Sequence, residues 1–104
     1  MTDQPLHPDE CQTMRDVRAG VDATDAALIK LLEIRFGYMR AAARIKDDRN
    51  VVRDEARKAQ VIAQAVTLGE AAGIPAAHIR SVWEELVEQS IAYELGVWDA
   101  TRQG

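Results

Sequence analysis

The stretch MRDVRAGVDATDAALIKLLEIRFGYMRAAARIK, residues 14–46, decides the fold of this chain. At 100° per residue, apolar side chains recur along one side of it, within about 60° of Val17. The members of this apolar stripe are Val17, Val21, Leu28, Leu32, Met39 and Ala42. The spacing predicts one long helix that begins between Asp9 and Thr13 and ends near Asp47.

Prolines mark the limits of the helical part. Pro5 and Pro8 indicate a flexible or extended leader over residues 1–9, and no proline follows until Pro75. The residues between them are rich in strong helix formers. Residues 10–104 are therefore expected to form one domain.

Helix-breaking and helix-capping residues predict two further helices. Residues 47–50 (DDRN) form a polar break, after which the pair Val51–Val52 is expected to dock on the core. Asp54 then caps a second helix that ends near Gly69. The turn Gly-Ile-Pro at 73–75 precedes a third helix over residues 76–100. No strand alternation appears, so the fold class is all-α with three helices.

Composition excludes several classes of partner. A chain of 104 residues with a net charge of −4 lacks the basic surface that nucleic acid requires. No apolar run approaches the roughly 18 residues of a membrane span. The single cysteine, Cys11, cannot form an intrachain disulfide, and the start MTDQPLHPDEC has no signal-peptide core. These features predict a cytoplasmic location.

Two cations interrupt the apolar stripe of the long helix. Arg35 falls at about 0° and Lys46 at about 20° relative to Val17. Burying an unpaired cation costs several kcal/mol, so an anionic group from another segment or a ligand is expected to meet them.

The other two helices carry polar groups on their apolar sides as well. In the second helix Arg57 precedes Val61, Ala65 and Leu68 on one side. In the third, Ser90 and Glu94 fall within the arc of Ile79, Val82, Trp83, Leu86, Tyr93 and Val97.

Each of these polar residues also has a purely structural interpretation. Lys46 can extend to solvent from a helix end, and Glu94 can be the buried partner of Lys46 or Arg35. Arg57 can pair with Asp54 or Gln60 on the surface. Taken together, however, three inward cations outnumber the acids available, which favours a pocket for an anion.

Helix geometry bears on assembly. Arg35 and Lys46 are about 16.5 Å apart along the axis, which suits a small metabolite between them, whereas Arg18 is about 25 Å from Arg35. Arg18 reaches the same ligand only from a second copy packed antiparallel. The long apolar stripe also needs more cover than two short helices provide, so a homodimer is expected.

The sequence resembles the all-helical (type II) chorismate mutases over roughly residues 10 to 100. Three stretches carry the resemblance. The first is MRDVR at 14–18, continued by Asp25, Leu28, Leu31–Leu32, Arg35 and Ile45–Lys46. The second is VRDEAR at 52–57, and the third is EQSIAYE at 88–94.

This resemblance implies an intertwined homodimer with two equivalent sites. Arg35 would hold one carboxylate of the substrate, helped by Arg18 of the other chain. Arg57 would bind the second carboxylate. Lys46 would donate a hydrogen bond to the ether oxygen of the breaking C–O bond, with Glu94 as its companion there.

The remaining site residues implied by the resemblance lie at the second helix start and on the third helix. Asp54 and the backbone near Arg53 would meet the ring hydroxyl, and Ser90 would line the carboxylate end. The implied reaction is the [3,3] rearrangement of chorismate to prephenate, in phenylalanine and tyrosine biosynthesis. It needs no cofactor or metal, and His7 and His78 lack ligand partners at metal-site spacing.

Two departures from the family pattern bear on the reaction. Where the best-known members carry glutamine, this chain has Glu94, which we hypothesise works protonated as a hydrogen-bond donor. Lys58 stands where the family often has glutamate. It points to solvent, pairs with Glu94, or reports a different ring substituent.

Three alternatives to the mutase remain at this point. The similar isochorismate-pyruvate lyases tend to lack the acid at Asp54 and the serine at Ser90, and this chain has both. Lys58 leaves an amino-substituted chorismate open as a substrate. The non-enzyme alternative is a helical interaction module, for which replacing Lys46 by Met would be neutral or stabilising.

Overall fold

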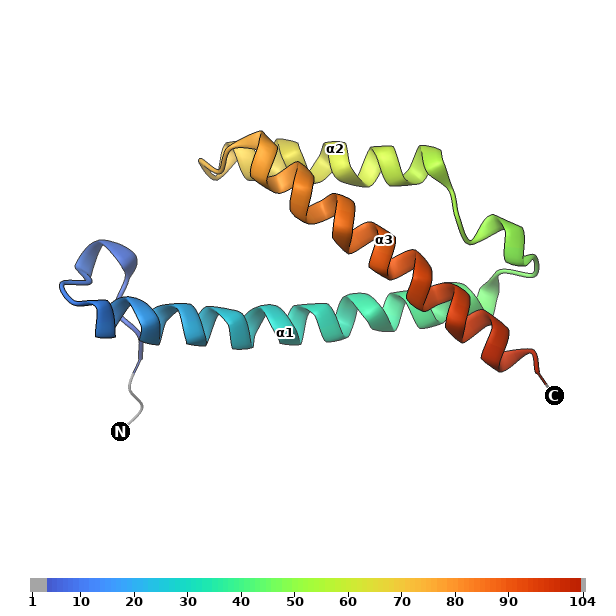
Figure 1. Cartoon of the computed structure of the whole chain (residues 1–104), viewed down its shortest axis with the longest axis horizontal. Coiled ribbons are helices and arrows are strands. Elements are labelled where there is room, and N and C mark those ends of the chain that lie inside the picture. The colour runs from blue at the N-terminus through green and yellow to red at the C-terminus, as the bar shows by residue number, and fades with distance from the viewer. Residues whose placement is uncertain (1–3, 104) are drawn as a thin grey trace. The chain divides into compact units, whose positions relative to one another are not determined.

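The long helix begins at a reciprocal capping arrangement. In the computed structural model, which describes residues 4–103, the Thr13 hydroxyl accepts a hydrogen bond from the Asp16 amide at 3.1 Å. The Asp16 carboxylate accepts from the amides of Gln12 and Thr13. These bonds satisfy amides that a helix start leaves without partners, and helix α1 runs over Met14–Ile45 (Figure 1). The Gln12 amide also holds the pKa of Asp16 below its usual value.

The chain forms two units, divided after Arg35, and each is described here by itself. The first contains a 3₁₀ turn, η1, at Pro8–Glu10 and the first part of α1. Residues 1–3 of the predicted leader lie outside the described residues. The apolar stripe of this unit is largely exposed, with Val21 at 52% of its full surface and Leu28 similar. Within the single chain, this stripe is therefore not part of the core.

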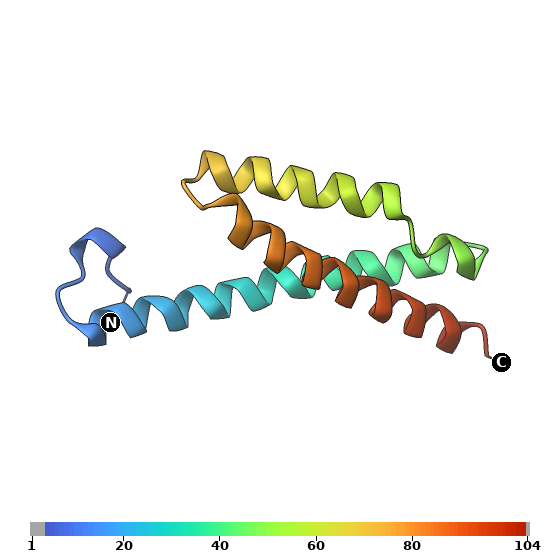
Figure 2. The ribbon, with the colours of Figure 1, turned by 45° about the horizontal axis from the view of Figure 1, so that its top comes forward.

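The second unit holds the apolar core. It contains the end of α1, a 3₁₀ turn η2 (Arg49–Val51), and the helices α2 (Glu55–Ala71) and α3 (Ala76–Thr101). Helices α2 and α3 lie side by side (Figures 1 and 2). The buried side chains at their centre are Val52, Ile62, Val66, Val87 and Ile91.

A Schellman turn ends α2. The amide of Ile74 donates to the carbonyl of Gly69 at 2.9 Å, and the amide of Gly73 donates to that of Glu70 at 3.0 Å. Gly73 has a φ of 81°, a conformation that glycine adopts without strain. Pro75 then stands at the N-cap of α3, so the predicted turn is confirmed.

The polar break after α1 is also built by side-chain caps. The Asp48 carboxylate accepts from the Asn50 amide at 2.9 Å and starts η2. Of the predicted valine pair, Val52 enters the core, whereas Val51 is exposed.

The three predicted helices are confirmed, and no strand occurs in residues 4–103. The predicted inward faces are wrong in three places, and one of them is Arg57, whose side chain is exposed. Leu68 is 72% exposed, because α2 turns Ala65, Val66 and Gly69 inward instead. Val82 is exposed because the buried side of α3 runs through Val87, Ser90, Ile91 and Glu94.

None of the helices within residues 4–103 combines the length and apolar character needed to cross a membrane. The same part of the chain holds no group of His, Cys, Asp and Glu placed to bind a metal ion.

Candidate active site

The end of α1 meets α3 through a largely buried ion pair. Lys46 Nζ lies 2.8 Å from Glu94 Oε2, and the side chains are 29% and 5% exposed. The sequence-based interpretation of Glu94 as the partner of Lys46 is therefore confirmed. Removing either partner would leave the other charge buried and poorly solvated. The stability of the fold therefore depends on both side chains together.

The backbone of Lys46 is fixed by the end of α3. Its carbonyl oxygen accepts hydrogen bonds from Trp98 Nε1 at 3.0 Å and from Arg102 Nη2 at 2.6 Å. Arg102 in turn stacks over the Trp98 ring, 4.3 Å from its centroid. These contacts replace the hydrogen bonds that a helix end leaves unmade, and they hold Lys46 at a set position. The sequence offered no local sign of them.

Ser90 lies one turn before Glu94 on α3, and both residues are buried. The Ser90 hydroxyl donates to the Leu86 carbonyl at 2.7 Å. The prediction that Ser90 and Glu94 face the interior is confirmed.

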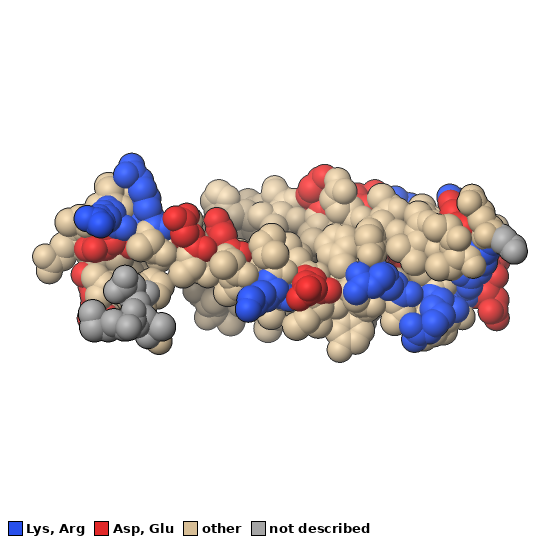
Figure 3. Space-filling model, turned by 90° about the horizontal axis from the view of Figure 1, so that it is seen from below, with Lys and Arg blue, Asp and Glu red and all other residues tan. Residues whose placement is uncertain are grey.

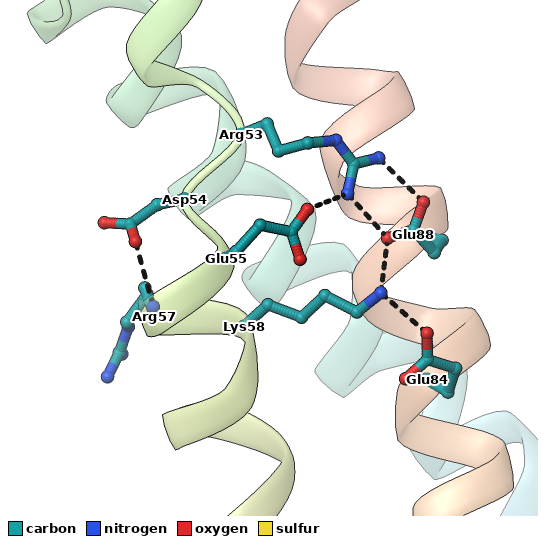
Figure 4. Close-up of polar contacts among 7 residues, drawn as sticks. All are labelled: Arg53, Asp54, Glu55, Arg57, Lys58, Glu84 and Glu88. Atoms are coloured by element: carbon teal, nitrogen blue, oxygen red, sulfur yellow. Dashed lines mark hydrogen bonds and ion pairs between the residues drawn. The ribbon is translucent and has the colours of Figure 1, made fainter.

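The start of α2 places Asp54 and Arg57 together. Asp54 is the N-cap, and its Oδ1 accepts from the Arg57 amide at 3.0 Å, as predicted. The Arg57 guanidinium donates to Gln60 Oε1 at 2.7 Å, which is the surface contact that the sequence had left open. Both side chains are exposed and point to the same side of α2 (Figure 4).

A charge network on the other side ties α2 to α3 (Figure 4). Arg53 Nη2 lies 2.8 Å from Glu88 Oε1, and Arg53 Nη1 also reaches Glu55 at 2.9 Å. Lys58 Nζ contacts Glu84 at 2.6 Å and Glu88 at 2.8 Å. Arg53 and then Lys58 lower the pKa of Glu88 to about 2, while Glu84 and Glu88 raise the pKa of Lys58.

This network corrects the interpretation of Lys58. Its side chain is only 15% exposed, and its partners are Glu84 and Glu88 rather than solvent or Glu94. On α3, Glu88 lies about 160° around the axis from Ser90 and about 120° from Glu94. Lys58 is therefore held by a different face of α3 from the one that carries Ser90 and Glu94. Neither acid was predicted as a partner of Lys58 from the sequence, although their i, i+4 spacing places them on one face of the helix.

Arg53 is committed to the same network. Its guanidinium is bound by Glu88 and Glu55, which raise its pKa. Because its side chain is occupied, Arg53 can meet a ligand through its backbone. The family resemblance implied this same backbone contact.

Arg18 and Arg35 belong to the first unit. One uninterrupted helix carries both, so the spacing of about 25 Å along the axis holds. Arg35 is half-buried, and this burial lowers the pKa of its guanidinium; Arg18 is exposed.

The predicted residues Lys46, Arg53, Asp54, Arg57, Ser90 and Glu94 all belong to the second unit. Chemically they supply hydrogen-bond donors and positive charge, together with a buried acid beside an ammonium group. This is a set suited to bind carboxylates and to stabilise developing negative charge.

Two comparisons with known proteins bear on the family of this chain. The family model for chorismate mutase type II matches residues 17–95. The chain is also 24% identical over 95 residues to the isochorismate pyruvate lyase of Pseudomonas aeruginosa, a match covering 91% of this chain and 94% of the relative. With its three helices and the family match over most of its length, the chain belongs to the type II chorismate mutase family of enzymes.

Proposed function

We propose that the protein is a chorismate mutase that converts chorismate to prephenate, as a step toward phenylalanine and tyrosine. The observation that carries this proposal is the buried Lys46–Glu94 pair in a member of this family. An ammonium and an acid at 2.8 Å, anchored through the Lys46 carbonyl, can both be directed at one oxygen of a ligand.

The reaction itself asks for positioning and electrostatics. The ether C–O bond breaks while a C–C bond forms within the same molecule, so no group is transferred to the protein. Lys46 donates to the ether oxygen, where negative charge grows in the transition state. Arg35 and Arg57 each hold one carboxylate and keep the side chain folded over the ring.

The other site residues recognise the ring and the carboxylate end. Asp54 and the backbone of Arg53 meet the ring hydroxyl, and Ser90 lines the carboxylate end. Glu94 acts protonated in the substrate complex, since an ionised carboxylate would repel the charge developing on the ether oxygen. Substrate then replaces the direct Lys46–Glu94 contact.

The second candidate is the isochorismate-pyruvate lyase reaction, and the Pseudomonas aeruginosa relative favours it. We favour the mutase because Asp54 and Ser90 are both present, and lyases tend to lack these groups. The case for an amino-substituted ring rested on Lys58. Its ammonium group is bound by two carboxylates of α3, so this substrate loses its support.

We also propose that the active form is a homodimer. In the single chain, α1 exposes large apolar side chains along its whole length; they are Met14, Val17, Val21, Leu28, Ile29, Leu31, Ile34, Tyr38 and Ile45. A second copy would cover them and bring its Arg18 to the site.

The test offers the purified protein chorismate and isochorismate separately. Formation of prephenate from chorismate is the expected result. Salicylate plus pyruvate from isochorismate, without prephenate from chorismate, would instead assign the lyase. If neither product forms from either compound, both candidate reactions are contradicted and the helical interaction module remains.

A further inference from the structure

A hollow of about 550 Å³ lies between the ends of α1 and α3, and none of the predicted site residues lines it. It is lined by Arg40, Arg44, Val97, Thr101 and Arg102. Figure 3 shows several blue lysine and arginine side chains toward the C-terminal end of the chain, and others near its N-terminal end. Three guanidinium groups thus line one hollow in a protein whose net charge is −4.

These three arginines differ from four other cations, which form ion pairs with acids: Lys46, Arg49, Arg53 and Lys58. Within residues 4–103, no carboxylate lies within ion-pair distance of Arg40, Arg44 or Arg102.

Two of the three are held in place by neutral groups. Arg40 Nη1 donates to the Tyr93 hydroxyl at 3.0 Å. Arg102 stacks on Trp98 and donates to the Lys46 carbonyl and to the Thr101 hydroxyl. Their remaining N–H groups stay free for a ligand, and each positive charge remains uncompensated.

Arg44 has no hydrogen-bond or ion-pair partner in the described part of the chain. A favourable interaction with the helix dipole explains Arg44 in the last turn of α1. The same interaction explains Arg102 at the end of α3. It does not account for Arg40, an exposed arginine farther from the helix end that lines the same hollow. A bound anion would offset the repulsion among the three positive charges.

The hollow is separate from the candidate active site. Around the axis of α1, Arg40 and Arg44 lie about 120° and about 160° from Lys46. The side of α1 that faces Glu94 is therefore not the side that lines the hollow.

We propose that this hollow is a second anion site, which binds a small molecule carrying two or more negatively charged oxygens. A guanidinium fork matches carboxylate and phosphate oxygens equally well, so a polycarboxylate and a phosphate ester are the two sources of that chemistry. Three arginines favour a multivalent anion over a single carboxylate, and Val97 offers an apolar wall for its carbon skeleton.

The chain carries its own reporter for a test, because it has two tryptophans. Trp98 lies under Arg102, and Trp83 lies four turns earlier on α3. Inorganic phosphate and citrate are titrated separately at constant ionic strength, with chloride as the balancing salt, and the two indole N–H signals are followed by NMR. The Trp98 signal should shift saturably while the Trp83 signal stays in place. Whichever anion binds more tightly identifies the source.

Matched variants decide between this hollow and other sites. Arg44→Gln should weaken binding about tenfold, the loss expected for one charge-assisted contact. Arg80→Gln, an exposed arginine of α3 outside the hollow, should leave it unchanged. A Trp98 response that fails to saturate, or that survives Arg44→Gln, overturns the proposal. A response lost in Arg57→Gln instead would assign the anion to the candidate active site and equally overturn it.

Discussion

At the scale of single residues, the pair Lys46–Glu94 has a structural role and a proposed catalytic one. Glu94 is almost fully buried, so its charge depends on the ammonium group 2.8 Å away. The sequence predicted that these two residues share the interior, because both fall on apolar stripes. It did not predict that Trp98 and Arg102 fix the Lys46 carbonyl, since those contacts span more than 50 residues.

Replacing Lys46 alone should damage both fold and function. Lys46→Met leaves the Glu94 carboxylate buried without its partner, at a cost of about 3 kcal/mol in the free energy of unfolding. Lys46→Met combined with Glu94→Gln removes both charges and should restore most of that stability. Both variants should lose at least about 100-fold in kcat/KM, as expected for a lost transition-state donor. Denaturant unfolding and steady-state kinetics measure the two effects, and activity in the stable double variant would contradict the assigned role.

The proposal that Glu94 acts protonated can be tested through the pH dependence of the reaction. If the protonated acid is the active form, kcat/KM of the wild type falls as pH rises and Glu94 ionises. In Glu94→Gln the amide donates at every pH, so its profile should be flat over the same range. Profiles of the two proteins with the same slope would exclude a proton-bearing Glu94.

At the scale of elements, the contact between α2 and α3 depends on a close approach and on a charge network. A Cβ on Gly69 would lie 2.5 Å from Ile79 Cγ1, too close for the helices to stay in place. The network of Arg53, Lys58, Glu84 and Glu88 adds ion pairs at one edge of the same contact. Sequence periodicity located both helices but misjudged the rotation of α2, because a glycine gives no hydrophobic signal for the side that packs.

Gly69→Ala should therefore destabilise the protein. The added methyl group must displace Ile79, and overpacking of this kind costs about 1–3 kcal/mol. Gly96→Ala is the matched control on α3. No atom lies within 4 Å of its Cβ position, so it should stabilise the helix by about 1 kcal/mol. Thermal unfolding compares the two, and a neutral or stabilising Gly69→Ala would refute the close approach.

The network should make stability depend on acid pH. The pKa of Glu88 is about 2 in the folded chain and about 4.5 when unperturbed, so its contribution is complete above pH 4.5. It is lost as pH falls from 4.5 toward 2, because the unfolded state then binds a proton that the folded state, with its lower pKa, does not yet bind. Glu88→Gln should lower the unfolding midpoint at pH 7, and its difference from the wild type should shrink between pH 5 and 3 as measured by circular dichroism. Glu85→Gln is the control, because the Glu85 carboxylate accepts a hydrogen bond from the Gln89 side-chain amide and forms no ion pair within residues 4–103. A difference that stays constant with pH would contradict this assignment.

At the scale of the whole molecule, the proposed dimer explains why α1 exposes apolar side chains along its length. It also explains Arg18, which one straight helix holds about 25 Å from Arg35. The two features are independent, since one is the exposure of apolar side chains and the other is the distance between Arg18 and Arg35.

Mixed dimers test the shared site directly. Arg18→Ala chains and Lys46→Met/Glu94→Gln chains should each be inactive alone. After co-refolding at equal amounts, half of the dimers are mixed and each has one intact site, so activity should return to about a quarter of the wild type. No recovery, despite dimers seen by light scattering, would mean that each chain supplies its own Arg18 or none.

The sequence by itself determined what depends on near neighbours along the chain. The helix-starting cap at Asp54, the glycine turn at Gly73 and the interior positions of Ser90 and Glu94 follow from spacing over a few residues. Tertiary structure alone decided what depends on distant partners. Spacing along the sequence allowed several acids of α3 as partners of Lys58. The packing of α2 on α3 brings Glu84 and Glu88 to it, because packing determines which helix faces meet.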